Sequence, residues 1–487
     1  MSGAVLVSPA EAPTRAGPGR RRLALALGLT WLLVTGWAAT GIGARATYGA
    51  RVTADEPQYL LSAISLAEDH DLDIADELAE RRWRAFHAVE LPEQTRLLPG
   101  GRRLSPHDPL LPLLLAGPVA LGGWVGAKLA LAAMAGALAA LLVWTAVRRL
   151  GVGLVPALAA VGVMALSPPL AVYATQVYPE LPAALAVAVG LAAVTGPPGR
   201  RGPGWWVAAG LAVVALPWFG VKYAPVAAVL ALAVAWRLAA PPPTRPGGAW
   251  GWRPLLAWAG ALALAGVVYV AAHLAIYGGL TPYAVGDHFV GGELDVVGTE
   301  PNYLGRSTRL AGLLTDREFG LIAWQPAWLL AVPALAALAR RRTGGWAAVT
   351  GVLAAGWLTA SFVALTMHGW WWPGRQVVAV LPAAVLVLAW WAGQAGRSRV
   401  ALLAGVGALG VVNLAWVLAE ARAGRLTLVV DFMATTSPLY RAWSVLLPAL
   451  RTPEGWWTWV LHGLWLAVLA GAAVLGWRGA GRQPAGR

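Results

Sequence analysis

Cysteine is absent from the 487-residue sequence, and its absence excludes disulfide bonds, thiolate metal sites and a cysteine nucleophile. Charge is scarce too, since charged residues make up 12% of the chain against about a quarter in soluble proteins. Lysine is nearly missing, with only Lys128 and Lys222. The sequence has no phosphate-cradling glycine loop of the nucleotide-binding type, so we do not expect it to use ATP or nucleotide sugars.

What the chain has in abundance is apolar sequence. Hydrophobic residues make up 58% of it, too much for one soluble core, and 28 tryptophans suit the interfacial belts of a membrane protein. The composition therefore predicts an all-α integral membrane protein. About twelve spans are expected, at residues 23–44, 124–146, 151–170, 180–196, 205–219, 223–240, 254–277, 319–339, 346–367, 376–394, 400–419 and 457–477.

The distribution of charge predicts the orientation of these spans. Short arginine clusters recur between apolar runs, so that one side holds 19 of the 37 basic residues but only Glu11 of the 23 acidic ones. This positive-inside pattern predicts a cytoplasmic-membrane protein with cytoplasmic tails at 1–22 and 478–487, around a membrane domain at 23–477. Substantial outer loops are expected at 45–109, 278–318 and 420–456. Clusters of this kind do not form a nucleic-acid-binding stripe.

Two adjacent carboxylates, Asp55 and Glu56, stand just beyond the first span and beside Pro57. A base at this position would lie at the membrane surface, next to a lipid-borne substrate. The alternative is a helix start, in which the carboxylate accepts backbone N–H bonds and proline occupies the first turn. The loop is expected to form interfacial helices at 55–69 and 76–89, with an apolar lead-in to the second span at 110–122.

Two cations stand at the outer ends of later spans. Lys222 lies among apolar residues, where a charge is costly without a partner, although a lysine at a span end can also extend to the interface. Arg375 follows three tryptophans, and its fork suits bidentate binding of phosphate, although interfacial anchoring is the alternative. The remaining candidates for substrate or phosphate binding are His107, Arg306, Tyr59, Glu180 and Trp372. Ordinary roles compete for these too: loop residue, solvated arginine, helix cap or aromatic belt.

No resident metal or cofactor is predicted. The run Asp69-His70-Asp71-Leu72-Asp73-Ile74 has the carboxylate spacing of a calcium-binding EF-hand loop, with Glu80 following. It lacks the required turn glycine, so an acidic turn between two helices is expected instead. A divalent metal at Asp55 and Glu56 stays open.

The order of these features resembles the GT-C superfamily of integral-membrane glycosyltransferases, in particular protein O-mannosyltransferases and aminoarabinose transferases. The resemblance rests on Asp55-Glu56 after the first span and on His107-Asp108-Pro109 at the end of the loop. Further short stretches also resemble the family: Tyr178-Pro179-Glu180-Leu181-Pro182, Val221-Lys222-Tyr223, Asp316-Arg317-Glu318 and the aromatic run 368–375.

The resemblance implies a GT-C-type bundle whose first outer loop carries interfacial helices. It also implies transfer of a sugar from a polyprenyl-phosphate carrier to an acceptor hydroxyl outside the membrane, with Asp55 as base and inversion at the sugar. The acceptor, whether glycan, lipid, protein or small molecule, is left open. A transporter or flippase of lipid-linked sugars is the alternative, because it would have a similar number of spans.

Overall fold

The computed structural model describes residues 18–196, 202–239, 252–287, 302–364, 366–367 and 371–481. Within these ranges the ordered elements are helices, and strand pairing is limited to isolated bridges such as that between Asp73 and Leu104. Most of the predicted N-terminal tail, the second half of the C-terminal tail and part of the predicted loop 278–318 fall outside the described residues.

Helices account for the predicted spans. In the part of the chain that the structure describes, seven helical segments are long and apolar enough to cross a membrane: α1 (Arg20–Ala39), α4 (Leu110–Arg148), η3 (Val221–Tyr223) continuing into α9 (Ala224–Ala239), α10 (Trp252–Tyr277), η7 (Arg375–Val380) continuing into α16 (Leu381–Gln394), α17 (Arg397–Arg422) and α19 (Trp456–Ala480). Four shorter apolar helices match other spans: α5 (Leu154–Ala165), α7 (Glu180–Val194), α8 (Pro203–Phe219) and α15 (Trp346–Phe362). The prediction of an all-α membrane fold is confirmed.

The predicted span 319–339 is not one helix. It is divided into α13 (Leu321–Trp324), η6 (Pro326–Leu330) and α14 (Ala331–Arg341). The break falls at Gln325, whose extended backbone ends α13 before Pro326 begins the next turn. The remaining short elements are α6 (Leu170–Tyr173), η2 (Pro99–Gly101), η4 (Pro282–Val285), α11 (Tyr303–Arg306), α12 (Arg309–Thr315), η8 (Phe432–Ala434) and α18 (Pro438–Ser444).

Helix α4 includes the apolar lead-in at 110–122 that the sequence predicts before the second span. The lead-in is helical and continues into the span through a kink at Gly122 and Gly123, whose backbone angles are not helical. Gly123 has a φ of +57°, a conformation that residues with a side chain rarely adopt. Past the kink, a Cβ at Gly126 would stand 2.1 Å from the carbonyl oxygen of Pro118. Glycine therefore allows the chain to change direction tightly here.

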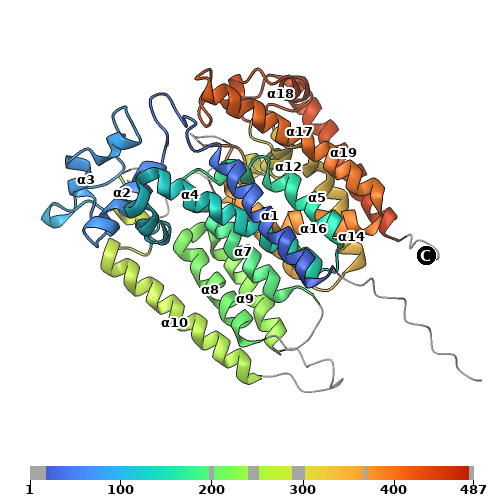
Figure 1. Ribbon diagram of the computed structural model, residues 1–487, viewed down its shortest axis with the longest axis horizontal. Coiled ribbons are helices and arrows are strands. Elements are labelled where there is room, and N and C mark those ends of the chain that lie inside the picture. The colour runs from blue at the N-terminus through green and yellow to red at the C-terminus, as the bar shows by residue number, and fades with distance from the viewer. Residues whose placement is uncertain are drawn as a thin grey trace, which may run out of the picture.

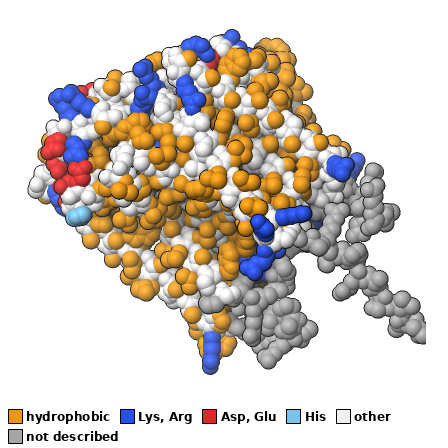
Figure 2. All heavy atoms as spheres, in the orientation of Figure 1, with side chains coloured by type: hydrophobic (Ala, Val, Ile, Leu, Met, Phe, Trp, Pro, Cys, Tyr) orange, Lys and Arg blue, Asp and Glu red, His pale blue; other side chains and the backbone are white. Residues whose placement is uncertain are grey.

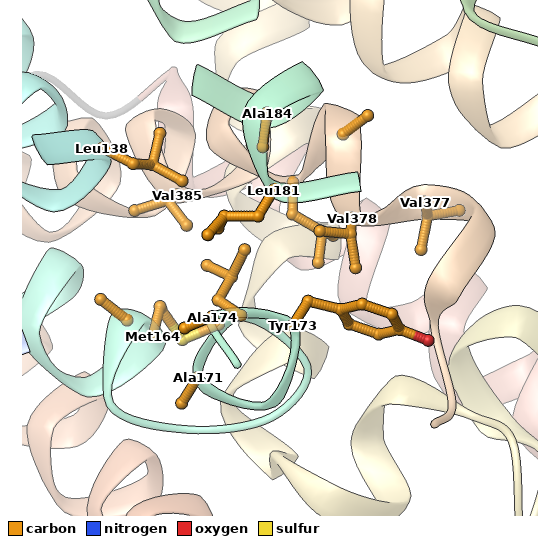
Figure 3. Packing of buried hydrophobic residues seen from close by; sticks show 14 of the residues in the cluster. Leu138, Met164, Ala171, Tyr173, Ala174, Leu181, Ala184, Val377, Val378 and Val385 are labelled. Atoms are coloured by element: carbon orange, nitrogen blue, oxygen red, sulfur yellow. The ribbon is translucent and has the colours of Figure 1, made fainter. Parts of the chain in front are cut away.

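The helices pack around a core in which α4, α7 and α16 meet (Figure 1). Figure 3 shows side chains from α4, α5, α6, α7, η7 and α16 around Leu181 and Tyr173. Leu181 and Tyr173 are fully buried, as are Val378 and Val385. This core fixes the start of α7 and the whole of η7, and both segments carry residues of the site described below.

The outer surface is apolar where lipid would contact it. None of the most apolar 18-residue window of α10 is buried in the protein, and only 11% of that of α19 is. Figure 2 shows hydrophobic side chains across the middle of the molecule, with charged side chains gathered towards its ends. The acidic side chains visible in this view gather mainly where Figure 1 places α2 (Glu56–Glu68) and α3 (Ala75–Ala79). The chain is thus a multi-pass membrane protein.

The first loop matches its prediction in part. The helix expected at 55–69 forms as α2, but it does not show a single apolar face, because nine of its 13 residues are buried and it packs against α4. Its polar residues face the protein as well; Ser65, for example, donates to the carbonyl oxygens of Asp71 and Asp73. The second predicted helix, 76–89, is reduced to α3 and a short turn, η1 (Arg82–Ala85), because Arg81 adopts a left-handed conformation between them.

Candidate active site

Asp55 lies at the start of α2, but it does not cap the helix. Its backbone is already helical, with φ −82° and ψ −17°, and its side chain makes no capping hydrogen bond. Instead, its Oδ2 atom accepts a hydrogen bond of 2.7 Å from Nη2 of Arg375, 320 residues away in the sequence. The capping alternative for Asp55 is therefore wrong. The side chain is 23% exposed, so it is accessible from outside the protein.

Arg375 is held in place from several sides. It follows Gly374, whose φ of +83° and close contact with Leu321 would both disfavour a side chain. Its guanidinium carbon lies 3.9 Å from the ring centroid of Tyr178 and 4.8 Å from that of Trp371. Its side chain is only 8% exposed, so its position is fixed by packing as well as by charge.

Glu180 joins the two cations. Its Oε1 atom accepts from Nε of Arg375 at 3.0 Å and from Nζ of Lys222 at 2.7 Å. Lys222 also donates to Oε1 of Gln376 at 3.0 Å, and its side chain is 20% exposed. Because both cations contact one buried oxygen, they are kept as neighbours on the same side of Asp55. The structure thus brings Asp55, Glu180, Lys222 and Arg375 into one connected group, which we call the charge cluster.

The charge cluster keeps Asp55 ionised at neutral pH. Burial by itself raises the pKa of the Asp55 carboxyl, but Arg375, Lys222 and, at acidic pH where its ring is protonated, His107 together outweigh burial and bring the pKa below its ordinary value of 3.8. Two carboxylates and two cations balance one another in the cluster. Lys222 is already paired with Glu180, so a further anion at the exposed edge of Lys222 would contact a cation whose charge is already balanced.

Glu56 has a different position from Asp55, although the two are adjacent. It is fully buried, and its carboxylate accepts backbone N–H bonds from Thr53 at 3.1 Å and Val177 at 2.7 Å. Burial raises the pKa of Glu56, while nearby Lys128 opposes this shift. Glu56 therefore ties the start of α2 to the segment before α7.

Tyr59 and His107 form an aromatic side of the site. Their rings stack with centroids 4.8 Å apart, and Nε2 of His107 lies 3.1 Å from Oε1 of Gln94. Gln94 in turn donates to the carbonyl oxygen of Ala54 at 3.2 Å. Burial lowers the pKa of His107, and Asp55 only partly opposes this, so the ring is neutral at pH 7. His107 therefore supplies a polar, uncharged edge beside Asp55.

A buried polar pair extends the site towards the lipid-facing side. Oδ1 of Asp108 lies 3.8 Å from Nε2 of His273, and burial raises the pKa of Asp108. His273 packs against Trp218, with ring centroids 5.1 Å apart. Trp218 lines an open, apolar groove of about 430 Å³ together with Leu66, Leu72, Pro109, Leu110, Leu113, Leu211, Val214 and Ala215. An apolar groove therefore adjoins the polar site through His273 and Trp218.

Two candidate residues lie elsewhere. Trp372 is fully buried against Trp324 and Phe432, with ring centroids 5.0 and 4.9 Å away, so its ring is not open to a substrate. Residues 368–370 of the aromatic run lie outside the described residues; among the described ones, Trp371 contacts the charge cluster through Arg375. Arg306, at the end of α11, donates to the carbonyl oxygen of Phe362 at 2.7 Å and ties α11 to the end of α15.

The sequence analysis did not single out Gln94, Gln376 or His273. Gln94 and Gln376 gave no signal, because their importance lies in contacts with residues distant in the sequence. His273 did carry one: it is an ionisable residue inside a long apolar helix, and such residues are rare away from sites.

The fold of this chain is like that of the GT-C membrane glycosyltransferases. One solved structure that it resembles is that of ArnT from Cupriavidus metallidurans bound to undecaprenyl phosphate, with a TM-score of 0.52 and 16% identity over 94% of this chain and 72% of that one. The apo state of ArnT matches with a TM-score of 0.47 and the same identity, over 94% and 74% of the two chains. No family model and no curated protein sequence matches.

Proposed function

We propose that the protein transfers a sugar from a polyprenyl-phosphate carrier to an acceptor hydroxyl, on the outer side of the cytoplasmic membrane. The observation that carries the proposal is the charge cluster, in which two cations share one buried oxygen of Glu180 beside the carboxylate of Asp55. Such a reaction needs a base near the acceptor and cations for the departing phosphate. The resemblance in fold to ArnT, solved with undecaprenyl phosphate bound, supports the same carrier class.

In the proposed step, an acceptor oxygen attacks the anomeric carbon and forms the new glycosidic bond. Asp55 takes the acceptor's proton, and the bond from the anomeric carbon to the phosphate oxygen breaks. That oxygen leaves with the electron pair, so the phosphate gains a negative charge. Lys222 and Arg375 stabilise this charge, and one displacement inverts the configuration at the sugar. Glu180 is a positioning residue that holds both cations.

Two cavities are lined by residues that neighbour the charge cluster, although its four members line neither of them. The apolar groove of about 430 Å³ beside Trp218 suits the prenyl chain, which would approach from the lipid. A second cavity, of about 350 Å³, is formed in the first loop by Gln58, Trp83, Glu90, Gln94, Arg103 and their neighbours. Its lining mixes apolar residues with the charged side chains of Arg81, Glu90, Glu93 and Arg103, and Gln94 connects it to His107. We assign this second cavity to the acceptor.

The test is an assay of the purified protein with a panel of polyprenyl-phosphate sugars that differ in the sugar, measuring release of polyprenyl phosphate. We expect turnover with at least one donor, and its loss in the Asp55→Asn variant. Glu68→Gln is the matched control, because Glu68 is an exposed carboxylate at the other end of α2. Absence of release with every donor, together with movement of intact donor across vesicle membranes, would instead identify a transporter.

A further inference from the structure

A second cluster of carboxylates lies in the first loop, outside the charge cluster. Asp69 ends α2, and Asp76 and Glu77 lie in α3. Each offers one carboxylate oxygen, and these three oxygens lie within 4.8 Å of one another. Among the residues that the structure describes, this is the group of three acidic side chains whose oxygens lie close enough together to hold one metal ion.

Neighbouring acidic residues of the loop already have hydrogen-bond or ion-pair partners, and this distinguishes them from Asp69, Asp76 and Glu77. Asp71 accepts hydrogen bonds from Ser65 and from the backbone N–H of Asp73. Asp73 accepts from the backbone N–H groups of Ala75 and Arg103. Two further acids, Glu68 and Glu80, pair with Arg82 at 2.6 and 3.6 Å. The calcium ligands that the EF-hand spacing would supply are therefore not available as a set, because Asp71 and Asp73 accept the hydrogen bonds that stabilise the turn.

Glu77 is the observation that points to a ligand. It is 2% exposed, and neither of its carboxylate oxygens has a hydrogen-bond partner among the described residues. A buried carboxylate without partners is costly, so native proteins normally supply a donor, a cation or a proton. The buried Glu77 carboxylate, which has no hydrogen-bond partner among the described residues, thus lies beside the exposed carboxylates of Asp69 and Asp76.

We propose that Asp69, Asp76 and Glu77 bind a hard divalent cation, with Ca²⁺ the best fit. All three ligands are carboxylates, the oxygen donors that Ca²⁺ and Mg²⁺ prefer. Two of the three residues are exposed and lie on short loop elements, which suits the flexible coordination and water ligands of Ca²⁺ better than the strict octahedron of Mg²⁺. An open site of this kind has a dissociation constant on the order of 0.1–1 mM.

The bound cation would join the end of α2 to α3. Ala75, Leu78 and Ala79 of α3 line the polar cavity of the first loop, so a cation at this cluster would fix one wall of that cavity. The proposal does not depend on the transferase activity, because both the site and its test concern cation binding alone.

The test measures Ca²⁺ binding to the full-length protein, purified in detergent and stripped of metals, by titration calorimetry at pH 8. We expect one saturable site per chain, and at least a tenfold weaker dissociation constant in Glu77→Gln. Asp76→Asn is a second variant for the case in which Glu77→Gln fails to fold, since Asp76 is exposed. Glu90→Gln, which removes an exposed charge from the same loop, should bind Ca²⁺ like the wild type.

A second readout locates the cation. Hydrogen exchange in the segment 66–80 should slow on addition of Ca²⁺ in the wild type and in Glu90→Gln, but not in Asp76→Asn. Absence of saturable binding up to about 10 mM, far above the expected dissociation constant, would overturn the proposal and leave Glu77 sharing a proton with Asp76. Equal weakening in Glu90→Gln would overturn it too, because general charge screening would then explain the binding.

Discussion

Replacing Arg375 by lysine keeps the positive charge but removes the planar fork. In the structure, Nη2 and Nε of Arg375 reach two different carboxylates, Asp55 at 2.7 Å and Glu180 at 3.0 Å. A lysine offers one compact ammonium group and cannot hold both in the same geometry. We therefore expect Arg375→Lys to lose one charge-assisted contact and to bind a phosphate less well.

The expected loss of affinity for polyprenyl phosphate follows from the loss of one buried, charge-assisted contact of Arg375. A hydrogen bond to a charged group contributes about 1.5–3 kcal/mol, which corresponds to about a 10- to 150-fold weaker affinity for polyprenyl phosphate. Arg375→Ala should cost more, about 3–5 kcal/mol of folding stability, because it removes a cation from a buried ion-pair group. It should also raise the pKa of Asp55, since burial would no longer be opposed by its strongest counter-charge.

The assay is equilibrium binding of a fluorescent polyprenyl phosphate to each purified variant, combined with thermal unfolding. Arg317→Lys is the matched control, because Arg317 also pairs with a carboxylate, Glu454, but that carboxylate is 64% exposed. An exposed pair contributes at most about 1 kcal/mol, so the control should bind like the wild type. Unchanged affinity in both Arg375→Lys and Arg375→Ala would refute the reasoning and place the phosphate elsewhere.

Asp55→Asn should reduce turnover about a hundredfold or more while leaving carrier binding within a fewfold of wild type. A single-turnover rate like that of the wild type would contradict this prediction. Glu56→Gln should instead lower the thermal stability, because it weakens the acceptor of two buried backbone N–H bonds; a loss of turnover at full stability would contradict that role. Gly374→Ala should reduce carrier binding by displacing Arg375, since φ is +83° there and the new Cβ would stand 2.8 Å from a methyl carbon of Leu321. Because the pKa of Asp55 is lowered, its ion pair stabilises the fold above the ordinary value of 3.8, and this stabilisation is lost as the pH falls through the folded-state pKa. The acidic limb of the kcat profile should therefore lie below pH 3.8 wherever the protein stays folded. An acidic limb near neutral pH would indicate that another group titrates.

The sequence was most informative where the membrane makes charge costly. Asp55, Lys222 and Arg375 could be singled out because each is an ionisable residue at the boundary of an apolar segment. The structure places all three in one group, with Asp55 and Arg375 in direct contact. Their assignment to base and phosphate ligands stays a prediction.

The role of neighbouring residues could not be foreseen from the sequence. Asp55 and Glu56 are adjacent, yet one pairs with a cation and the other with two backbone N–H groups, because successive residues of a helix point in different directions. Glu180 could be interpreted as a helix cap until its two cations, 42 and 195 residues away in the sequence, were located. Pairings across such separations depend on packing that periodicity does not encode.

The first loop shows the same limit. The apolar positions of α2 indicated a helix lying on the membrane, but Ser62 and Ser65 are as buried as Leu60. Small polar residues pack closely against neighbouring helices once their hydroxyl groups find acceptors, as Ser65 does in the acidic turn. At 69–74 the sequence predicts an acidic turn rather than a calcium loop, and the hydrogen bonds that Asp71 and Asp73 accept within this segment agree with a turn.

The account centres on the claim that the charge cluster holds the phosphate of a polyprenyl carrier. The most direct measurement is a structure of the protein with a polyprenyl phosphate bound, determined in lipid nanodiscs by electron cryomicroscopy. The account predicts phosphate oxygens within hydrogen-bond distance, roughly 3 Å, of Lys222 Nζ or the Arg375 guanidinium, with the prenyl chain in the groove beside Trp218. A phosphate bound away from both cations, or a chain that leaves this groove empty, would contradict it.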